Sequence, residues 1–290
     1  MNASRFMFLL CCLLLLTACV RDYSGITRIR AGEYLITNNR PGFFETCELT
    51  EDGQGLKCRR LSFMVSKYQF YDFEGVAWVN DDLFYAVIEK RNNRCMFGCK
   101  LEQFILPFHI DQRRRVTIGS CGEMEIPLQK GDDPNCPFAN CGLEGVAFNP
   151  SENLLYVAKE RDRKRLFKVP LKDDFCPSGN FEQFEIGDNF SGYSDLAYSE
   201  KRKSLFVLSR SDRAFVEYSF VEKKIVLHSR DLPEAALFMD ENPDVEGIFV
   251  EDDDGSLVLL AESKAFLRMK LAGGQIILPA SGQASQGQKP

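Results

Sequence analysis

Short apolar segments alternate with polar turns along the chain and recur at a regular spacing. Residues 143–148 (LEGVAF) lead through a polar turn to residues 154–159 (LLYVAK). The same pair of segments appears at 73–78 (FEGVAW) with 83–88 (LFYAVI), and at 245–249 (VEGIF) with 257–261 (LVLLA). Two weaker copies begin at Tyr23 and Tyr193. Short apolar runs joined by turns of Asn, Asp and Ser predict β-hairpins. A sustained 3.6-residue period is absent, which argues against long helices.

Each copy begins with a polar residue followed by glycine or aspartate. The lead residues are Ser24, Glu74, Glu144, Ser194 and Glu246. They lie about 50, 70, 50 and 52 residues apart, a period typical of propellers and solenoids. The long interval contains the cysteine-rich residues 121–141, interpreted here as an insertion in one unit. Five small repeated sheets can bury both of their faces by packing radially around an axis. We therefore predict an all-β fold, a five-bladed β-propeller over residues 23–278, with six blades as the alternative.

The start of the chain has the features of an export signal. Residues 1–18 hold one basic residue, Arg5, and an apolar run that ends in Leu-Thr-Ala before Cys19. This ending resembles the bacterial lipoprotein signal, which implies a lipid on Cys19; the alternative is an ordinary signal peptide with a chance cysteine. Val20, rather than aspartate, implies the outer membrane by the same resemblance. Residues 19–22 would form a tether, and the Ser-, Gly- and Gln-rich residues 279–290 a disordered tail.

Eight cysteines remain beyond the signal and Cys19, and an even number in an exported chain favours disulfides. Cys47 and Cys58 flank a turn-rich segment, so we predict that they pair across two strands. Cys95 with Cys99 is the next close pair. The other four are expected to pair within the insertion and its neighbouring blade: Cys121, Cys136, Cys141 and Cys176. The formal charge of -6 gives no indication of a nucleic-acid partner.

The order of dipeptides at the unit starts carries a family resemblance. It runs Ser-Gly, Glu-Gly, Glu-Gly, Ser-Asp and Glu-Gly, with Ala-Lys-Glu-Arg at 158–161 and Val-Leu-Ser-Arg at 207–210. This order resembles the bacterial SdiA-regulated propellers over roughly residues 23–271, a family related in architecture to phytase-like esterase propellers. The resemblance implies a propeller that can hold a divalent cation, without a firmly assigned reaction. The cysteines and the insertion depart from the family pattern, so no surface partner is carried over.

In a hairpin the start of the first strand and the end of the second lie at the same edge. Glutamates occupy both places in three units, as Glu74 with Glu89, Glu144 with Glu160, and Glu246 with Glu262. The other units have Ser24 with Asn38 and Ser194 with Ser209. We expect all of these side chains at one mouth of the axial channel, where the carboxylates raise one another's pKa unless they are compensated.

Three kinds of compensation are open: protonation, a bound cation, or nearby basic residues. The basic residues that follow the second strands are Arg40, Arg91, Arg161, Arg210 and Lys264. Oxygen ligands favour Ca²⁺ or Mg²⁺, and the candidate ligands are Glu74, Glu144, Asp195 and Glu246. Asp195 is included because it stands where the other units have glycine. The alternative is that the glutamates cap backbone N–H groups and the glycines allow close packing.

Two functions remain open from the sequence. The first is a lipid-anchored binding module that holds a protein partner or a small molecule at the propeller mouth. The second is a metal-assisted hydrolase of an ester, lactone or phosphoester, with a mouth glutamate as base. A Ser-His-Asp hydrolase has little support, because His109 and His228 are the only histidines and no Gly-x-Ser-x-Gly motif occurs.

Overall fold

The computed structural model describes residues 22–39, 42–51, 53, 55–64, 72–90, 102–127, 142–160 and 164–271. The predicted signal, Cys19, the tether up to residue 21 and the tail all lie outside these residues. The same holds for Cys95, Cys99, Cys136 and Cys141. No helix among the described residues has the length and apolar character needed to cross a bilayer.

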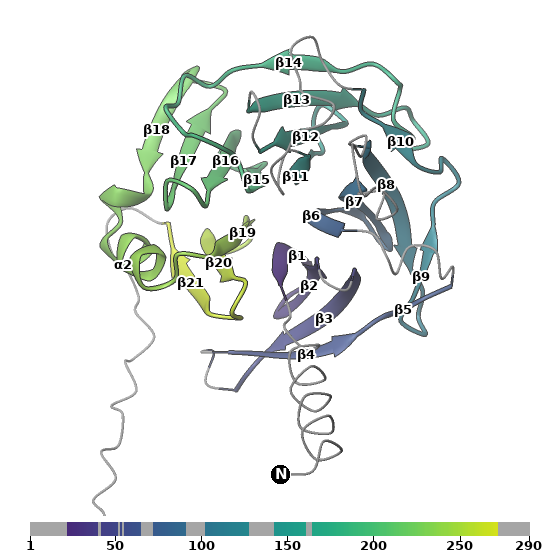
Figure 1. Ribbon diagram of the computed structural model, residues 1–290, viewed down its shortest axis with the longest axis horizontal. Coiled ribbons are helices and arrows are strands. Elements are labelled where there is room, and N and C mark those ends of the chain that lie inside the picture. Colours follow the sequence, from purple (N-terminus) through teal and green to yellow (C-terminus); the bar gives the residue numbers. More distant parts are fainter. Residues whose placement is uncertain are drawn as a thin grey trace, which may run out of the picture.

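Five antiparallel blades stand around one axis, which confirms the predicted five-bladed propeller (Figure 1). Blade 1 contains β1 (Tyr23–Arg30), β2 (Glu33–Asn38), β3 (Phe43–Leu49) and β4 (Leu56–Arg60). Blade 2 contains β6 (Asp72–Asn80), β7 (Leu83–Lys90), β8 (Glu102–Ile110) and β9 (Arg115–Ile118). Blade 3 contains β11 (Leu143–Asn149), β12 (Leu154–Lys159), β13 (Arg165–Pro170) and β14 (Glu182–Phe184).

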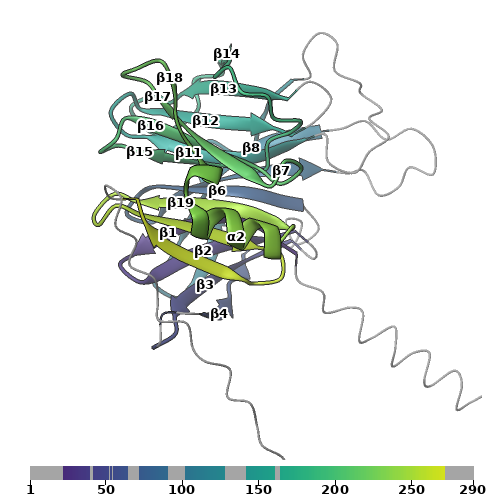
Figure 2. The same cartoon turned by 90° about the vertical axis from the view of Figure 1, so that its left-hand side faces the viewer.

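Blade 4 contains β15 (Asp195–Ser199), β16 (Ser204–Ser209), β17 (Ala214–Ser219) and β18 (Lys224–His228). Blade 5 has three described strands, β19 (Val245–Glu251), β20 (Ser256–Ala261) and β21 (Phe266–Lys270). The short η2 (Ser229–Asp231) and α2 (Pro233–Glu241) join blades 4 and 5, and α2 lies beside β20 and β21 (Figure 2). In each blade the first strand of the repeat is the innermost one, because the first strands of neighbouring blades contact one another around the axis (Figure 1).

The long unit is blade 2, as the spacing predicted. Its outer edge carries two additional short strands: β5 (Ser62–Phe63) pairs in parallel with β9, and β10 (Met124–Glu125) pairs with β8. Because β5 follows directly after blade 1 in sequence, the chain crosses to the edge of blade 2 before it enters that blade. This crossing ties the first two blades together at the outside of the ring.

Apolar clusters of described residues fill all five junctions between neighbouring blades. The junction of blades 1 and 2 is rich in phenylalanine, with the Phe44 and Phe108 rings stacked at 4.4 Å between centroids. Among the described strands, none is shared between blades 5 and 1 at the junction that closes the ring. Its cluster joins Ile26 and Tyr34 to Val258 and Leu260, and the Tyr34 hydroxyl donates to Glu251 at 2.6 Å. Side-chain packing therefore closes the propeller.

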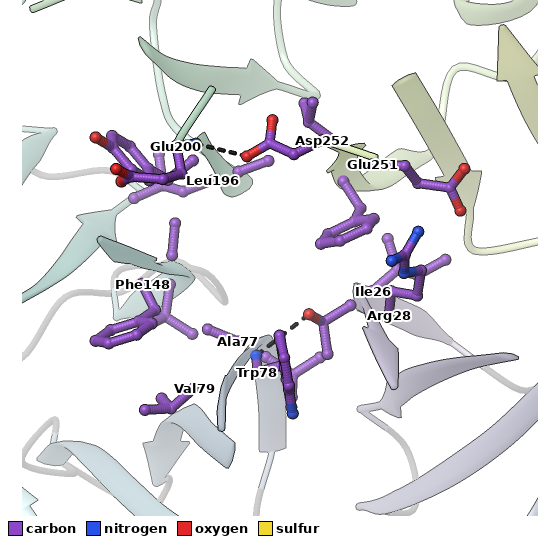
Figure 3. A pocket seen from close by; sticks show the side chains of 18 of the residues that line it. Ile26, Arg28, Ala77, Trp78, Val79, Phe148, Leu196, Glu200, Glu251 and Asp252 are labelled. Atoms are coloured by element: carbon purple, nitrogen blue, oxygen red, sulfur yellow. Dashed lines mark hydrogen bonds between the residues drawn. The ribbon is translucent and has the colours of Figure 1, made fainter. Parts of the chain in front are cut away.

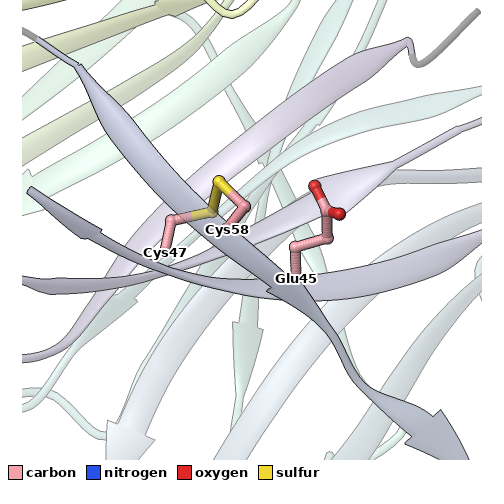
Figure 4. A group of neighbouring side chains, drawn as sticks. All are labelled: Glu45, Cys47 and Cys58. Carbon is pink, nitrogen blue, oxygen red and sulfur yellow. A yellow bond between two sulfur atoms is a disulfide. The ribbon is translucent and has the colours of Figure 1, made fainter. Parts of the chain in front are cut away.

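Two disulfides occur among the described residues. Cys47 and Cys58 are directly opposite on β3 and β4, with Cα atoms 4.0 Å apart, which confirms the predicted pair (Figure 4). Cys121 pairs with Cys176, so the segment after β9 is joined to the loop between β13 and β14 of blade 3. Glu45 lies beside the first disulfide and accepts a hydrogen bond from the Tyr23 hydroxyl at 2.5 Å. Because both sulfurs are bonded to each other, this group offers no thiolate to a metal.

Candidate functional site

The glycines after the lead residues bring the inner strands into backbone contact. A Cβ atom on Gly75 would lie 2.6 Å from the Glu144 carbonyl oxygen, and one on Gly25 would lie 2.6 Å from the Glu74 carbonyl oxygen. On Gly145 it would meet the Asp195 backbone at 2.7 Å. Real Cβ atoms do not approach so closely, so only glycine fits. We call this level of the channel the glycine layer, and it separates an acidic cavity at the start of the inner strands from an apolar space further along them.

The strand register identifies which residues occupy equivalent places at the acidic end. Tyr23 pairs with Asn38 as Phe73 pairs with Ile88 and Leu143 with Lys159. In blades 1 and 4, the second-strand residue equivalent to Glu89 and Glu160 therefore lies one residue later than the sequence suggested. The ring at the ends of the second strands consists of Asn39, Glu89, Glu160, Arg210 and Glu262. Asn38 does not belong to it, because it pairs with Tyr23 and so takes the place of Ile88 and Lys159. Ser209 does not belong to it either, because it directly follows Leu208, the partner of Asp195, as Lys159 follows Ala158, the partner of Gly145.

Each second-strand residue lies near the lead residue of the next blade, and the chemistry differs between junctions. From blade 1 to blade 2, the Asn39 side-chain amide donates to both carboxylate oxygens of Glu74 at 2.9 Å. From blade 4 to blade 5, Arg210 forms ion pairs with Glu246 and, at 2.8 Å, with Glu262. From blade 2 to blade 3, glutamate meets glutamate. Glu74, Glu89 and Glu144 bring one carboxylate oxygen each within 4.8 Å of one another.

This acidic triad, Glu74, Glu89 and Glu144, is buried, with 4%, 2% and 7% of the residue surface exposed. Glu89 packs against Gly142, where an added Cβ would lie 2.7 Å from its Cγ. The Oε1 atom of Glu144 has no hydrogen-bond partner among the described residues. Beside the triad is a cavity of about 240 Å³, which we call the acidic cavity. Its lining residues are Asp22, Asn39, Glu74, Glu144, Arg210, Glu246 and Glu262.

Burial is the main reason that these carboxyl groups resist ionisation. It raises the pKa of Glu74 well above its ordinary value, and the charges of Glu246, Glu89 and Asp72 raise it further. Burial also raises the pKa of Glu144, followed by the charges of Glu74 and Glu160. For Glu246, burial raises the pKa to about 8 although Arg210 opposes the shift. Among the described lining residues, the acidic cavity therefore holds more carboxyl groups than Arg210 can neutralise.

Asp195 lies in the glycine layer and not on the wall of the acidic cavity. Its carboxylate accepts the backbone N–H of Leu196 at 2.8 Å and that of Ile248 at 3.0 Å. Burial raises its pKa, and these N–H groups oppose the rise. Asp195 thus joins the inner strands of blades 4 and 5 where the other blades make direct backbone contact. The sequence prediction that it stands in a glycine position is correct, and its oxygens are engaged by backbone.

The remaining predicted mouth residues are buried at the same end of the ring. The Ser194 hydroxyl accepts the Arg210 backbone N–H at 2.8 Å, and the Ser209 hydroxyl donates to Asp212 at 2.5 Å. Ser24 and Asn38 are both buried in blade 1. Of the proposed counter-charges, Arg210 forms its ion pairs and Lys264 lies over the Tyr23 ring at 5.1 Å. Arg40, Arg91 and Arg161 lie outside the described residues.

Three residues of this end were missed by reading the sequence. Asn39 and Asp22 line the acidic cavity, and Lys159 is buried at the end of β12. Only the register could have identified Asn39, because its neighbour Asn38 is an equally suitable residue. Lys159 belongs to the run Ala-Lys-Glu-Arg, whose alternation within the strand gives no signal for a buried lysine.

Comparison with known families concerns the three blades that follow the insertion. Residues 128–270 match the family model described as SdiA-regulated. This part of the chain is similar to that family. It spans β11 to β21 and contains Glu144, Asp195 and Glu246, while Glu74 lies before it. The resemblance expected from the sequence is confirmed for this part of the propeller.

One solved structure supports the same fold, and two further ones align less closely. The Mala s 1 allergen of Malassezia sympodialis aligns with a TM-score of 0.52 at 11% identity, over 87% of this chain and 75% of that one. A nidogen/laminin complex aligns at 0.49 and 10% identity, over 89% and 80% of the two chains. A luciferin-regenerating enzyme aligns at 0.48 and 12% identity, over 88% and 78%. At these identities the similarity concerns the fold alone, which in propellers does not determine function.

Proposed function

We propose that this SdiA-regulated propeller is a binding module that holds a divalent cation, Ca²⁺ or Mg²⁺, at the acidic triad. The observation that supports it is the approach of three buried carboxylates within 4.8 Å. Like charges at this distance are costly unless they are protonated or share a counter-charge. The Oε1 atom of Glu144, which lacks a described partner, offers a ligand position. Carboxylate oxygens are the ligands that these hard cations prefer.

The ligand set differs from the one that the sequence suggested. Glu246 pairs with Arg210, and Asp195 accepts backbone N–H groups, so neither is needed by the triad. Glu89 takes their place. Ca²⁺ binds about six to eight oxygen atoms, so three side chains leave positions for water or for an oxygen of a bound molecule. The adjoining cavity of about 240 Å³ provides the space for such a molecule.

One observation favours the hydrolase as a second candidate. Glu246 lines the acidic cavity, and its pKa of about 8 lies near the value suited to proton transfer at neutral pH. A cation at the triad would polarise an ester or phosphoester oxygen, while Glu246 exchanges a proton with the reacting group. Release of p-nitrophenol from its acetate and phosphate esters, measured with and without Ca²⁺, distinguishes catalysis from binding.

The proposal places the module at a membrane through a lipid on Cys19, at the outer membrane. The support is the lipoprotein-like ending at residue 19, which lies outside the described residues. The mass of the N-terminal peptide from a membrane fraction measures this directly. A diacyl or triacyl cysteine is expected, and an intact Met1 would contradict the anchor.

Thermal unfolding in the presence of Ca²⁺ and Mg²⁺ tests the cation site. A cation at a hundredfold excess over its Kd stabilises the folded state by about 2.7 kcal/mol, which raises Tm by several degrees. The Glu144→Gln variant keeps the shape of the side chain and removes one ligand charge, so its Ca²⁺-dependent rise in Tm should shrink by at least about half. Glu182→Gln, on the exposed face of β14, removes the same charge elsewhere and should respond like the wild type.

The opposite outcome is equally defined. If purified wild-type protein contains no metal and its Tm is insensitive to millimolar Ca²⁺ and Mg²⁺, the triad is a protonated or ion-paired structural cluster. If Glu182→Gln and Glu144→Gln lose the response equally, the effect comes from general surface charge and not from the triad.

A further inference from the structure

Beyond the glycine layer the channel widens into a second hollow of about 410 Å³, which we call the apolar cavity. All five inner strands line it (Figure 3). Three residues after each lead position, three blades have alanine: Ala77, Ala147 and Ala197, all buried. The other two blades have Thr27 and Phe249 at this place. Small side chains at equivalent positions leave the middle of the channel open where longer ones would fill it.

The next position along each inner strand forms a ring of larger side chains. Trp78, Phe148 and Tyr198 stand there in blades 2, 3 and 4, and Arg28 and Val250 in the other two. Trp78 is 43% exposed, an uncommon state for a tryptophan, and its Nε1 donates to the Asp81 carbonyl at 3.3 Å. This bond holds one edge of the indole and leaves the ring on the rim of the cavity. Aromatic faces at a cavity mouth suit flat apolar ligands.

The charged groups around this cavity are engaged within the protein. Asp252 accepts the backbone N–H of Glu200 at 2.7 Å and that of Lys201 at 3.2 Å. Glu251 is held by Tyr34 and by Arg268 at 2.8 Å. Arg28 pairs with Asp253. These groups leave the walls apolar. Four carboxylates line the cavity against one arginine, and Arg268 and Lys203 pair with two of these carboxylates, Glu251 and Glu200, so the rim keeps a small excess of negative charge.

We propose that the apolar cavity binds a compact, uncharged apolar or aromatic molecule that stacks against Trp78. A volume of about 410 Å³ lies within the range of roughly 300–1,000 Å³ common to small-molecule sites. The acidic rim disfavours anions such as fatty acids, because bringing a negative charge to it without a partner is costly. The site does not depend on the proposed cation, because the glycine layer and Asp195 lie between the two cavities.

The chain contains a single tryptophan, so its intrinsic emission reports on this cavity alone. Two dyes with the same aromatic skeleton make a matched pair: N-phenyl-1-naphthylamine is neutral, and 1-anilinonaphthalene-8-sulfonate carries a negative charge. The neutral dye should quench Trp78 saturably with one-to-one stoichiometry. The anionic dye should bind at least about tenfold more weakly, a difference of about 1.4 kcal/mol.

Two variants locate the site. Ala147→Leu fills the cavity, and Trp78→Ala removes the rim aromatic at an exposed position that the fold tolerates. Each should weaken the affinity for the neutral dye, followed by dye emission, at least about fivefold. Leu237→Ala removes an exposed apolar side chain on α2, far from the inner strands, and should leave dye binding unchanged.

Three results would overturn the proposal. A cavity that holds only water gives no saturable quenching. Equal affinity for both dyes would show that the acidic rim does not select. Unchanged affinity in Trp78→Ala, together with a folded Ala147→Leu that binds normally, would place the dye elsewhere on the surface. If Ala147→Leu does not fold, Trp78→Ala decides alone.

Discussion

The two cavities of the channel are built by the same five inner strands and yet have opposite chemistry. The acidic cavity is lined by seven polar or charged residues, whereas alanine, valine, isoleucine and aromatic residues dominate the walls of the apolar one. The change occurs across a single layer, from the lead residues to those two positions further along each strand. Residues only two positions apart on each inner strand therefore line different cavities. Backbone contact at the glycine layer closes the space between these cavities.

The comparison also holds within the acidic end. The five junctions are equivalent in backbone, but Asn39 meets Glu74, Arg210 meets Glu246, and Glu89 meets Glu144. One junction is satisfied by a neutral amide, one by a cation, and one is acid against acid. The scaffold repeats, and single side chains decide the chemistry of each junction. A cation site is expected at the junction where carboxylates meet one another.

The glycine layer should be the most sensitive place in the channel. In Gly75→Ala the new Cβ would lie 2.6 Å from the Glu144 carbonyl oxygen, which is backbone and cannot move aside alone. We expect the free energy of unfolding to fall by about 3 kcal/mol, and the two cavities to lose their separation. Urea denaturation followed by circular dichroism measures the loss.

Gly55→Ala is the matched control. Its Cβ would meet Thr50 at 3.4 Å, an ordinary contact, in a turn at the outer edge of blade 1. Its effect should stay within about 0.5 kcal/mol. Similar losses in both variants would show that the inner strands are not in the tight contact described here.

The sequence predicted the repeat, the five blades, the Cys47–Cys58 pair and the gathering of glutamates, because all four depend on periodicity and local pairing. It could not predict which second-strand residue reaches the mouth. Only the strand register decides this, and Asn38 and Asn39 look alike in a polar turn. The apolar cavity gave no signal either. Ala77, Ala147 and Ala197 are ordinary strand residues until the ring closure brings them around one axis.

Replacing Arg210, the basic side chain on the wall of the acidic cavity, should have the next largest effect on stability. Arg210 is the one basic residue among the described lining residues, and it pairs with both Glu246 and Glu262. In Arg210→Gln these two carboxylates lose their partner, so the junction of blades 4 and 5 comes to resemble that of blades 2 and 3. We expect a loss of about 2 kcal/mol at neutral pH, less than for a fully buried pair because Arg210 is partly exposed.

The loss of stability in Arg210→Gln should be smaller at low pH. Glu246 is then protonated in both the wild type and the variant, so it has no negative charge that needs a partner. It should also be partly restored by Ca²⁺, because the variant offers a second group of acidic ligands. Dye binding at the apolar cavity should be unchanged, since the substitution lies on the other side of the glycine layer. A variant as stable as the wild type at every pH would show that the ion pairs of Arg210 do not compensate the cavity.

The pH dependence of stability distinguishes the two cavities without any mutation. Burial raises the pKa of Glu246 from 4.5 to about 8 and shifts Glu74 and Glu144 upward as well. A carboxyl with a raised pKa in the folded state binds protons more tightly there than in the unfolded chain. Its contribution to stability is therefore fully present below about pH 4.5 and is lost as the pH rises through about 8.

In a chelator, the free energy of unfolding should consequently fall between about pH 5 and pH 8.5. Ca²⁺ should oppose this fall, and its effect should grow with pH, because a cation competes with protons for the same oxygens. The neutral dye should bind equally well throughout, since no carboxyl of the acidic cavity faces it. Glu144→Gln should flatten the slope. A stability that rises over this interval would mean that the carboxylates are fully compensated when charged, and that the acidic cavity has no need of a cation.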